Sequence, residues 1–245
     1  MTAASVLITV FNCESFVQCA VASALAQIAS DFEVVVIDDG STDATALKLD
    51  QIKDARLKIS HCARMGRAKA LNFGIANCAS PYIAILDADD IALAHRLHLQ
   101  IAYLDAHQNI ALAGSRYRVF IDERGHAVHN ETVAPTAFRG IIEEIRHFRN
   151  PIFHSSIMFR KTLIEDVGGY DETLACTEDL DLYVRLAARH ELANMEERLS
   201  LKRLHAKQFF GGERNVFASR EGKEAETTVK RRIAALLCGD DVECR

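Results

Sequence analysis

Short apolar runs alternate with longer amphipathic segments through the first third of the chain. The runs are continuously apolar, as in strands buried on both faces, and they lie at residues 5–11, 32–38, 56–60 and 82–87. Between them, apolar residues recur at helical spacing, at residues 14–27, 41–52 and 66–79. This β-α-β-α-β-α-β order predicts an α/β fold with a mostly parallel sheet and helices on both faces. Ser41 or Thr42 is the expected N-cap of the second helix.

After residue 90 the strand and helix patterns no longer alternate regularly. Residues 112–130 predict two strands around a turn at 122–125, and two later strands are expected at 154–160 and 197–205. Helical patterns occupy residues 95–107, 138–148, 161–172 and 178–190. Gly168 and Gly169 should end the third of these helices. Residues 206–245 also look helical. No linker-like segment interrupts the chain, so we expect one domain over residues 1–245.

Composition excludes several functional classes. The chain has 245 residues, of which 49% are hydrophobic and 26% charged, and a net charge of -5, which gives no general attraction to nucleic acid. No apolar stretch approaches the roughly 18 residues of a membrane span, and the N-terminus lacks the basic region of a signal peptide. The seven cysteines have scattered spacings, which indicate buried thiols in a reducing compartment.

Acidic residues gather where two predicted strands end. Asp38 and Asp39 end the second strand, whereas Asp87, Asp89 and Asp90 follow the fourth. Parallel strands present their carboxyl ends at one edge of a sheet, where ligands bind, so these acids should meet in one cleft. Their mutual repulsion calls for a cation, and carboxylate oxygens suit Mg²⁺ or Mn²⁺. Either pair taken alone is also compatible with ordinary turn chemistry.

An ordered set of motifs resembles a known family. The segments VLITVFN, VVVIDDGSTD, GRAKALNFGIA, YIAILDADD, GGYDE and TEDLDLYVRLA follow one another over residues 5–205. In this order and spacing they resemble the inverting family 2 glycosyltransferases, which have the Rossmann-like GT-A fold. The resemblance implies a nucleotide-diphospho-sugar donor, usually a UDP-sugar, and a divalent metal, Mn²⁺ or Mg²⁺. It also implies a nucleotide-sugar-binding half at residues 1–110, an acceptor-side half at 111–205 and a helical tail at 206–245.

The resemblance assigns roles to individual residues. The residues expected to bind the nucleotide-sugar are Thr9, Phe11, Asn12, Glu14, Asp38, Asp39, Arg67, Lys69, Asp87 and Ala88. Asp89, the second acid of the Asp-x-Asp motif, and His205 are the expected metal ligands, and Asp179 matches the general base. Glu178 and His154 are expected on the acceptor side. Moving a sugar requires that the leaving diphosphate be neutralised and that the acceptor hydroxyl lose a proton, which these groups can do.

Two positions depart from the family's pattern. The family often has Pro where Thr9 stands, which affects the stiffness of the first loop, and Asn where Arg64 stands, which affects donor contacts. The Gln-x-x-Arg-Trp motif of processive polymerases is absent, and the chain has no Trp. This absence favours the transfer of one sugar per event.

Several of the residues with assigned roles also have an ordinary structural interpretation. Asp179 could cap its helix, His205 could simply end a strand, and His154 could be a half-buried, hydrogen-bonded histidine. Asp181 and Arg185 are interpreted as a surface or intrahelical pair.

The expected partners are a nucleotide-sugar and a saccharide or lipid-linked saccharide acceptor. Nine Lys or Arg within residues 202–232 could form a solvated helical face. They could also rest on an anionic membrane surface. We therefore expect a cytoplasmic protein, peripheral at the membrane in the second case, that contributes to cell-surface polysaccharide or glycolipid synthesis. The rival hypothesis is a non-catalytic nucleotide-sugar-binding or scaffold protein of the same fold.

Overall fold

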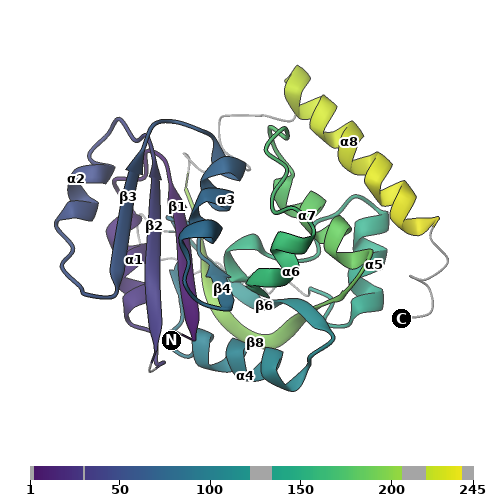
Figure 1. Cartoon of the computed structure of the whole chain (residues 1–245), viewed down its shortest axis with the longest axis horizontal. Coiled ribbons are helices and arrows are strands. Elements are labelled where there is room, and N and C mark those ends of the chain that lie inside the picture. Colours follow the sequence, from purple (N-terminus) through teal and green to yellow (C-terminus); the bar gives the residue numbers. More distant parts are fainter. Residues whose placement is uncertain (1–2, 30, 122–133, 206–218, 239–245) are drawn as a thin grey trace.

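A single eight-stranded sheet organises the molecule (Figure 1). The computed structural model describes residues 3–29, 31–121, 134–205 and 219–238. The strands are β1 (Ala4–Val10), β2 (Phe32–Asp39), β3 (Leu57–Cys62), β4 (Tyr82–Ile85), β5 (Ile91–Ala92), β6 (Ile110–Ile121), β7 (Met158–Arg160) and β8 (Glu191–Leu204). Their order is β3-β2-β1-β4-β7-β6-β8-β5, with antiparallel pairing where β5 or β7 takes part and parallel pairing elsewhere. The predicted mostly parallel sheet is confirmed.

Helices cover both faces of the sheet, as the sequence predicts. They are α1 (Val17–Leu25), α2 (Thr45–Asp50), α3 (Arg67–Asn77), α4 (Arg96–Ala106), α5 (Phe138–Arg146), α6 (Lys161–Asp166), α7 (Glu178–Ala187) and α8 (Arg220–Leu237). A short 3-10 helix, η1 (His154–Ser156), precedes β7. No described helix has both the length and the hydropathy to cross a bilayer.

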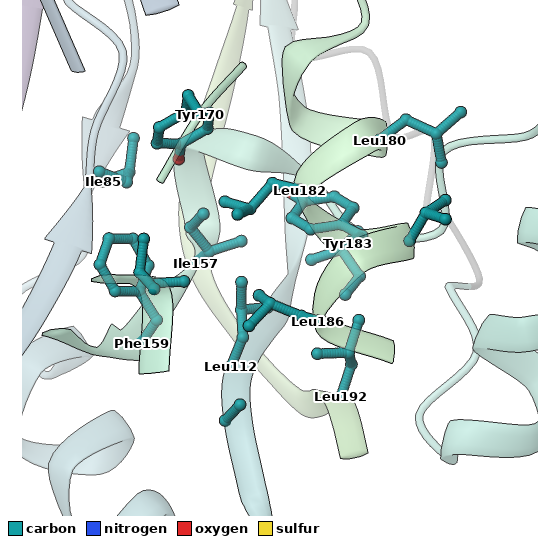
Figure 2. Packing of buried hydrophobic residues seen from close by; sticks show 14 of the residues in the cluster. Ile85, Leu112, Ile157, Phe159, Tyr170, Leu180, Leu182, Tyr183, Leu186 and Leu192 are labelled. Carbon is teal, nitrogen blue, oxygen red and sulfur yellow. The ribbon is translucent and has the colours of Figure 1, made fainter. Parts of the chain in front are cut away.

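Alternation along the strands produces two buried clusters, one on each face. Val34 and Val36 of β2 pack in the cluster that contains α1 and α4, while Val35 and Ile37 pack with α3. The second cluster continues through β6 to α5, α7 and α8. In Figure 2, Leu182 and Leu186 of α7 extend toward this part of the sheet. Each helix therefore covers the strands by burying its apolar stripe.

The structure differs from the sequence predictions at several local points. Helix α2 begins at Thr45, and neither Ser41 nor Thr42 is its N-cap. The carboxylates of Glu14 and Asp43 instead accept hydrogen bonds from the backbone N–H groups of Ala44 and Thr45, respectively, so one of these contacts is local and the other comes from the loop after β1.

Two other predicted elements can be compared with the structure, at residues 154–160 and 161–172. The predicted strand 154–160 is a turn of 3-10 helix followed by β7. The predicted end of the 161–172 helix is confirmed, because Gly168 and Gly169 have φ values of +83° and +69° that few other residues adopt. The predicted turn at 122–125 and the strand after it lie outside the described residues.

Candidate functional site

Three acids meet in the loop between β4 and β5. One carboxylate oxygen from each of Asp87, Asp89 and Asp90 lies within 4.8 Å of the others. The loop follows β4 directly. It lies beside the carboxyl ends of β1 and β2, because β1 pairs in parallel with β2 on one side and with β4 on the other. Among the described residues this group contains neither Asp38 nor Asp39, so their meeting with these acids in one cleft stays a prediction. Three carboxylate oxygens at this spacing form a donor set that suits Mg²⁺ or Mn²⁺.

Asp87 is held in its charged form by a neighbouring cation. Burial acts to raise the pKa of Asp87, but Arg67, the largest opposing cause, holds that pKa well below its usual range. The Arg67 guanidinium donates to Asp87 Oδ1 at 2.7 Å. The backbone N–H of Asp87 donates to Ser155 Oγ at 2.9 Å, which fixes the loop against η1.

Arg67 also connects this loop to the N-terminus of α7. Its Nε lies 2.9 Å from Oε1 of Glu178, whose side chain is 8% exposed. Burial raises the pKa of Glu178, and Arg67 gives the largest opposing effect. Although desolvation acts against it, the surrounding carboxylates raise the pKa of Arg67. One guanidinium on α3 therefore joins the acids of the β4–β5 loop to the acids of α7.

His154 is buried within this network. Arg67 donates to its Nδ1 at 3.1 Å, and its Nε2 lies 2.9 Å from the Tyr170 hydroxyl. Because Arg67 can only donate, the first hydrogen bond requires Nδ1 to accept. His154 is 6% exposed, more buried than the half-buried alternative of the sequence analysis. Its predicted place on the acceptor side stays a prediction.

Asp179, the predicted general base, is partly exposed at the start of α7. Its Oδ2 accepts a hydrogen bond from Asn150 Nδ2 at 2.5 Å, and its Oδ1 accepts from the backbone N–H of Leu180 at 2.7 Å. The Asp179 charge contributes to the raised pKa of Arg67. The neighbouring Glu178 is turned inward to Arg67, so the two acids face different surroundings.

Asp89 and Asp90 are supported from the end of β8. His205 Nε2 lies 3.0 Å from Asp89 Oδ2, which brings together the two predicted metal ligands. Arg203 donates through Nε to the Asp89 carbonyl at 2.7 Å and through its backbone N–H to Asp90 Oδ1 at 2.9 Å. The His205 imidazole therefore lies beside the three acids of the candidate metal group and contacts one of them.

Asp90 is the most deeply buried acid of the three. It is 3% exposed, and burial, followed by the charges of Asp89 and Asp87, raises its pKa well above the ordinary value. The sequence displays this acid next to the motif but gives no sign of its burial. Its hydrogen bond comes from Arg203, 113 residues further along the chain, so no local pattern could have indicated it.

The predicted nucleoside side lies at the ends of β1 and β2. Asp38 Oδ2 lies 2.9 Å from His61 Nδ1, and Asp38 Oδ1 accepts from the Ser41 N–H at 3.0 Å. Asp38 therefore faces β3. Asp39 accepts from the backbone N–H groups of Met65 and Gly66 at 2.6 and 3.1 Å, which fixes the loop that leads into α3 and Arg67.

Phe11 and Arg64 form an exposed stack beside Asp39. The Arg64 guanidinium carbon lies 3.9 Å from the centroid of the Phe11 ring, and the same guanidinium pairs with Asp39. Phe11 remains 36% exposed. An exposed ring and a planar cation provide faces on which a nucleobase can stack, and Arg64 is one of the two positions that depart from the family's pattern.

The remaining predicted nucleotide-sugar ligands have varied surroundings. Asn12 has φ of +52° and its side chain binds the Thr42 backbone, and Glu14 caps α2 as described above. Thr9 is partly buried in β1, and Lys69 is exposed on α3. Ala88 is buried, and its carbonyl accepts from the Cys13 thiol. Their roles in donor binding stay predictions.

Of the two alternatives expected for Asp181 and Arg185, the intrahelical pair is confirmed and the surface pair is not. Asp181 does pair with Arg185 along the helix, but it is fully buried rather than at the surface. Its other oxygen binds Arg232 of α8. Sequence reasoning also missed Tyr170, Ser155 and Asn150, which contact His154, Asp87 and Asp179, because these contacts join segments that are distant along the chain.

The sheet and the acidic loop define an α/β fold with a candidate cation site at the strand ends, and comparison with known proteins identifies the family. The profile of Glycosyl transferase family 2 matches residues 5–168. The chain belongs to this family, and its fold is the GT-A fold expected from the sequence.

Similar proteins agree with this assignment. A glycosyltransferase of Rickettsia conorii is 30% identical over 208 residues, which cover 83% of this chain and 33% of the relative. The amylovoran biosynthesis glycosyltransferase AmsE of Erwinia amylovora is 30% identical over 201 residues, which cover 79% of this chain and 73% of AmsE. The chain thus spans about a third of the Rickettsia relative.

A solved structure shares the fold at lower identity. S. aureus TarS 1-349 in complex with UDP-GlcNAc has a TM-score of 0.76 and 20% identity to this chain, covering 98% of it and 68% of the TarS chain. A second TarS structure, in complex with UDP, has a TM-score of 0.73.

Proposed function

We propose that this chain is an inverting glycosyltransferase that moves one sugar from a UDP-sugar to an acceptor hydroxyl. The observation that carries the proposal is the Arg67 bridge, which pairs with Asp87 of the acidic loop and with Glu178, the neighbour of Asp179 at the start of α7. The first group suits a metal-diphosphate and the second suits an acceptor. The UDP and UDP-GlcNAc complexes of TarS support a UDP-sugar as the donor.

A divalent cation, Mn²⁺ or Mg²⁺, is part of the proposal. Asp89 and His205 would hold it, with Asp87 and Asp90 alongside, since these donors lie together. When bound, the cation supplies Lewis-acid stabilisation of the diphosphate leaving group. Arg67 adds positive charge next to Asp87, on the same side of the site.

Asp179 is the proposed general base. Its carboxylate accepts the proton of the acceptor hydroxyl as that oxygen attacks the anomeric carbon. Asn150 donates to Asp179 Oδ2 and orients the carboxyl group. Attack from the face opposite the leaving diphosphate inverts the anomeric configuration. Glu178 stays ion-paired with Arg67 and holds the N-terminus of α7 toward the donor side.

The transferred sugar and the process are proposed more broadly. A hexosyl or N-acetylhexosaminyl group agrees with the UDP-GlcNAc complex of TarS. AmsE is named for amylovoran biosynthesis, and a putative glycosyltransferase of Bacillus subtilis, EpsE, is 30% identical over 188 residues. The AmsE name supports a role in cell-surface polysaccharide or glycolipid synthesis, on a saccharide or lipid-linked saccharide acceptor.

A peripheral position at the inner face of the cell membrane is the proposed location. The described part of the basic 202–232 region includes the exposed Lys223 and Arg231 of α8, but Arg220 and Lys230 pair with acids on the same helix. Salt-sensitive binding of the full chain to anionic vesicles would support the membrane contact. Absence of binding at low salt would contradict it.

Donor-dependent release of nucleoside diphosphate tests the transferase proposal. UDP, GDP and dTDP are first screened by calorimetry with and without Mn²⁺, and sugars of the bound nucleotide are then assayed. Replacing Asp179 with Asn should lower kcat by about 10²–10⁴-fold, since a general base contributes that much, with UDP affinity unchanged. Asp166→Asn, an exposed acid at the end of α6, is the matched control. Equal inactivity of wild type and Asp179→Asn, with UDP bound, would favour the non-catalytic scaffold instead.

A further inference from the structure

Helix α8 is fastened to the rest of the fold along one face. Ser219 caps its N-terminus by accepting a hydrogen bond from the Gly222 N–H at 3.0 Å. Ala225, Val229, Ile233 and Leu236 are buried at helical spacing. The last three belong to the cluster that contains α5 and α7, and Figure 1 shows α8 running beside these helices. Arg232 lies within this inner stretch.

Arg232 joins two acids from separate segments. One guanidinium nitrogen pairs with Asp181 of α7, and the other lies 2.7 Å from Oδ2 of Asp171. Asp181 is fully buried and also receives Arg185 at 2.7 Å. A buried carboxylate between two guanidiniums is held in one geometry, because loss of either partner leaves charge uncompensated away from water.

Both acids belong to segments that build the site. Asp171 follows Tyr170, whose hydroxyl binds His154 and through it Arg67. Asp181 lies two residues after Asp179, on the same first turn of α7. Desolvation acts to raise the pKa of Asp171, but hydrogen bonds from Thr173 and Arg232 lower it to about 2. The ion pair with Arg232 therefore persists across the working pH range.

We propose that Arg232 is a positioning residue for transfer, and that α8 acts as a clamp on the catalytic helix. By holding the 168–172 turn and α7 together, it keeps Asp179 at the angle that removes the acceptor proton. This inference rests on the proposed function. It adds that residues beyond 205 take part in catalysis through geometry, although the matched family profile ends at residue 168.

Arg232 differs from Arg220, Lys230 and Arg231 of α8 because it contacts acids of other segments. Arg220 and Lys230 pair with Glu224 and Glu226, one turn away on α8 itself, and such exposed pairs contribute little. Arg231 is exposed on the outer face. Changing Arg231 therefore removes the same charge from the same helix without touching the clamp.

The test compares Arg232→Met with the matched control Arg231→Met in the full chain, on a soluble saccharide acceptor without membranes, so that the proposed membrane contact of Arg231 plays no part. Arg232→Met should lower kcat by about 10- to 100-fold, since small displacements of a catalytic group have effects of this size. The KM for the donor should stay within about twofold of wild type, because Asp87 and Asp89 keep their contacts. Arg232→Lys should restore part of the rate. Amide hydrogen exchange at residues 178–182 should accelerate in Arg232→Met and not in Arg231→Met.

The outcomes are distinguishable. Active wild type together with an unchanged kcat in Arg232→Met overturns the inference, even if α7 exchanges faster. If wild type transfers no sugar, the proposed function fails, and unchanged exchange at residues 178–182 would then remove the clamp as well. If Arg232→Met fails to fold, Asp171→Asn can be used instead. It removes only the ion pair between Asp171 and Arg232, and the Asp171 side chain is 18% exposed. Its kcat should fall in the same direction, and an unchanged kcat would count against the clamp.

Discussion

Removing the Arg67 bridge should cost stability in a pH-dependent way. In Arg67→Met, Glu178 keeps a carboxyl group that is 8% exposed and has lost its ion-pair partner. Breaking a buried ion pair typically costs 3–5 kcal/mol. Because the Arg67 side chain is 39% exposed, solvent screening reduces this to about 2–3 kcal/mol. For a chain of this size, that loss lowers Tm by about 4–12 °C.

The sign of the pH effect follows from the raised pKa of Glu178. Its folded pKa lies above the ordinary value of 4.5 because burial disfavours the charged form. Loss of Arg67 raises it further, so folding favours the protonated carboxyl, and the mutant's deficit grows as the pH rises from 5 to 8. Asp87 loses the same partner, and because burial then acts to raise its pKa, it adds to the deficit in the same direction with pH.

Chemical denaturation at pH 5 and pH 8 measures the effect directly. Lys69→Met, an exposed cation on the same helix, is the control and should change stability by less than about 0.5 kcal/mol. Adding Glu178→Gln to Arg67→Met should recover part of the loss at pH 8, because the unpaired buried charge of Glu178 is then removed. Equal deficits for Arg67→Met and Lys69→Met at both pH values would refute this account of the bridge.

Three further predictions concern the nucleoside side. The hydrogen bond to Asp38 raises the pKa of His61 above 6.5. The loss of stability in His61→Asn should therefore be complete below pH 6.5 and should vanish as the pH rises through the raised pKa. Equal losses in urea titrations at pH 5.5 and pH 9 would contradict this prediction. Gly40→Ala should lower stability by about 1–3 kcal/mol in thermal unfolding, because Gly40 has φ of +72° and a Cβ there would lie 2.6 Å from the Arg64 nitrogen; wild-type stability would contradict the strain. Phe11→Ala should weaken UDP binding by about tenfold in calorimetry, as expected for the loss of base stacking, and unchanged affinity would place the base elsewhere.

The strands and the acidic edge were predictable because their signals are local. Continuous apolar runs identified β1, β2 and β4, and the rule for the ends of parallel strands placed Asp87 and Asp89 at one edge. The residue types of the Asp-x-Asp motif by themselves indicate a cation site. These inferences need only the spacing within a segment and the chirality of the connections.

The contacts that complete the site were not predictable in this way. Arg67 meets Glu178, and Arg232 meets Asp181, from segments that are 111 and 51 residues apart in sequence. A lone sequence shows that such charges exist but not which of them become buried together. The same limit explains the surface interpretation of Asp181, because its neighbours along α7 give no sign that α8 covers it.

The antiparallel pair of β5 and β8 has a consequence for biosynthesis. Ile91 pairs with Leu201, and the support of Asp89 and Asp90 comes from Arg203 and His205. During translation, the acidic loop leaves the ribosome more than a hundred residues before these partners. Nascent chains, and fragments that stop at residue 168, therefore carry an acidic loop that lacks these contacts, which form only after residue 205 has been made.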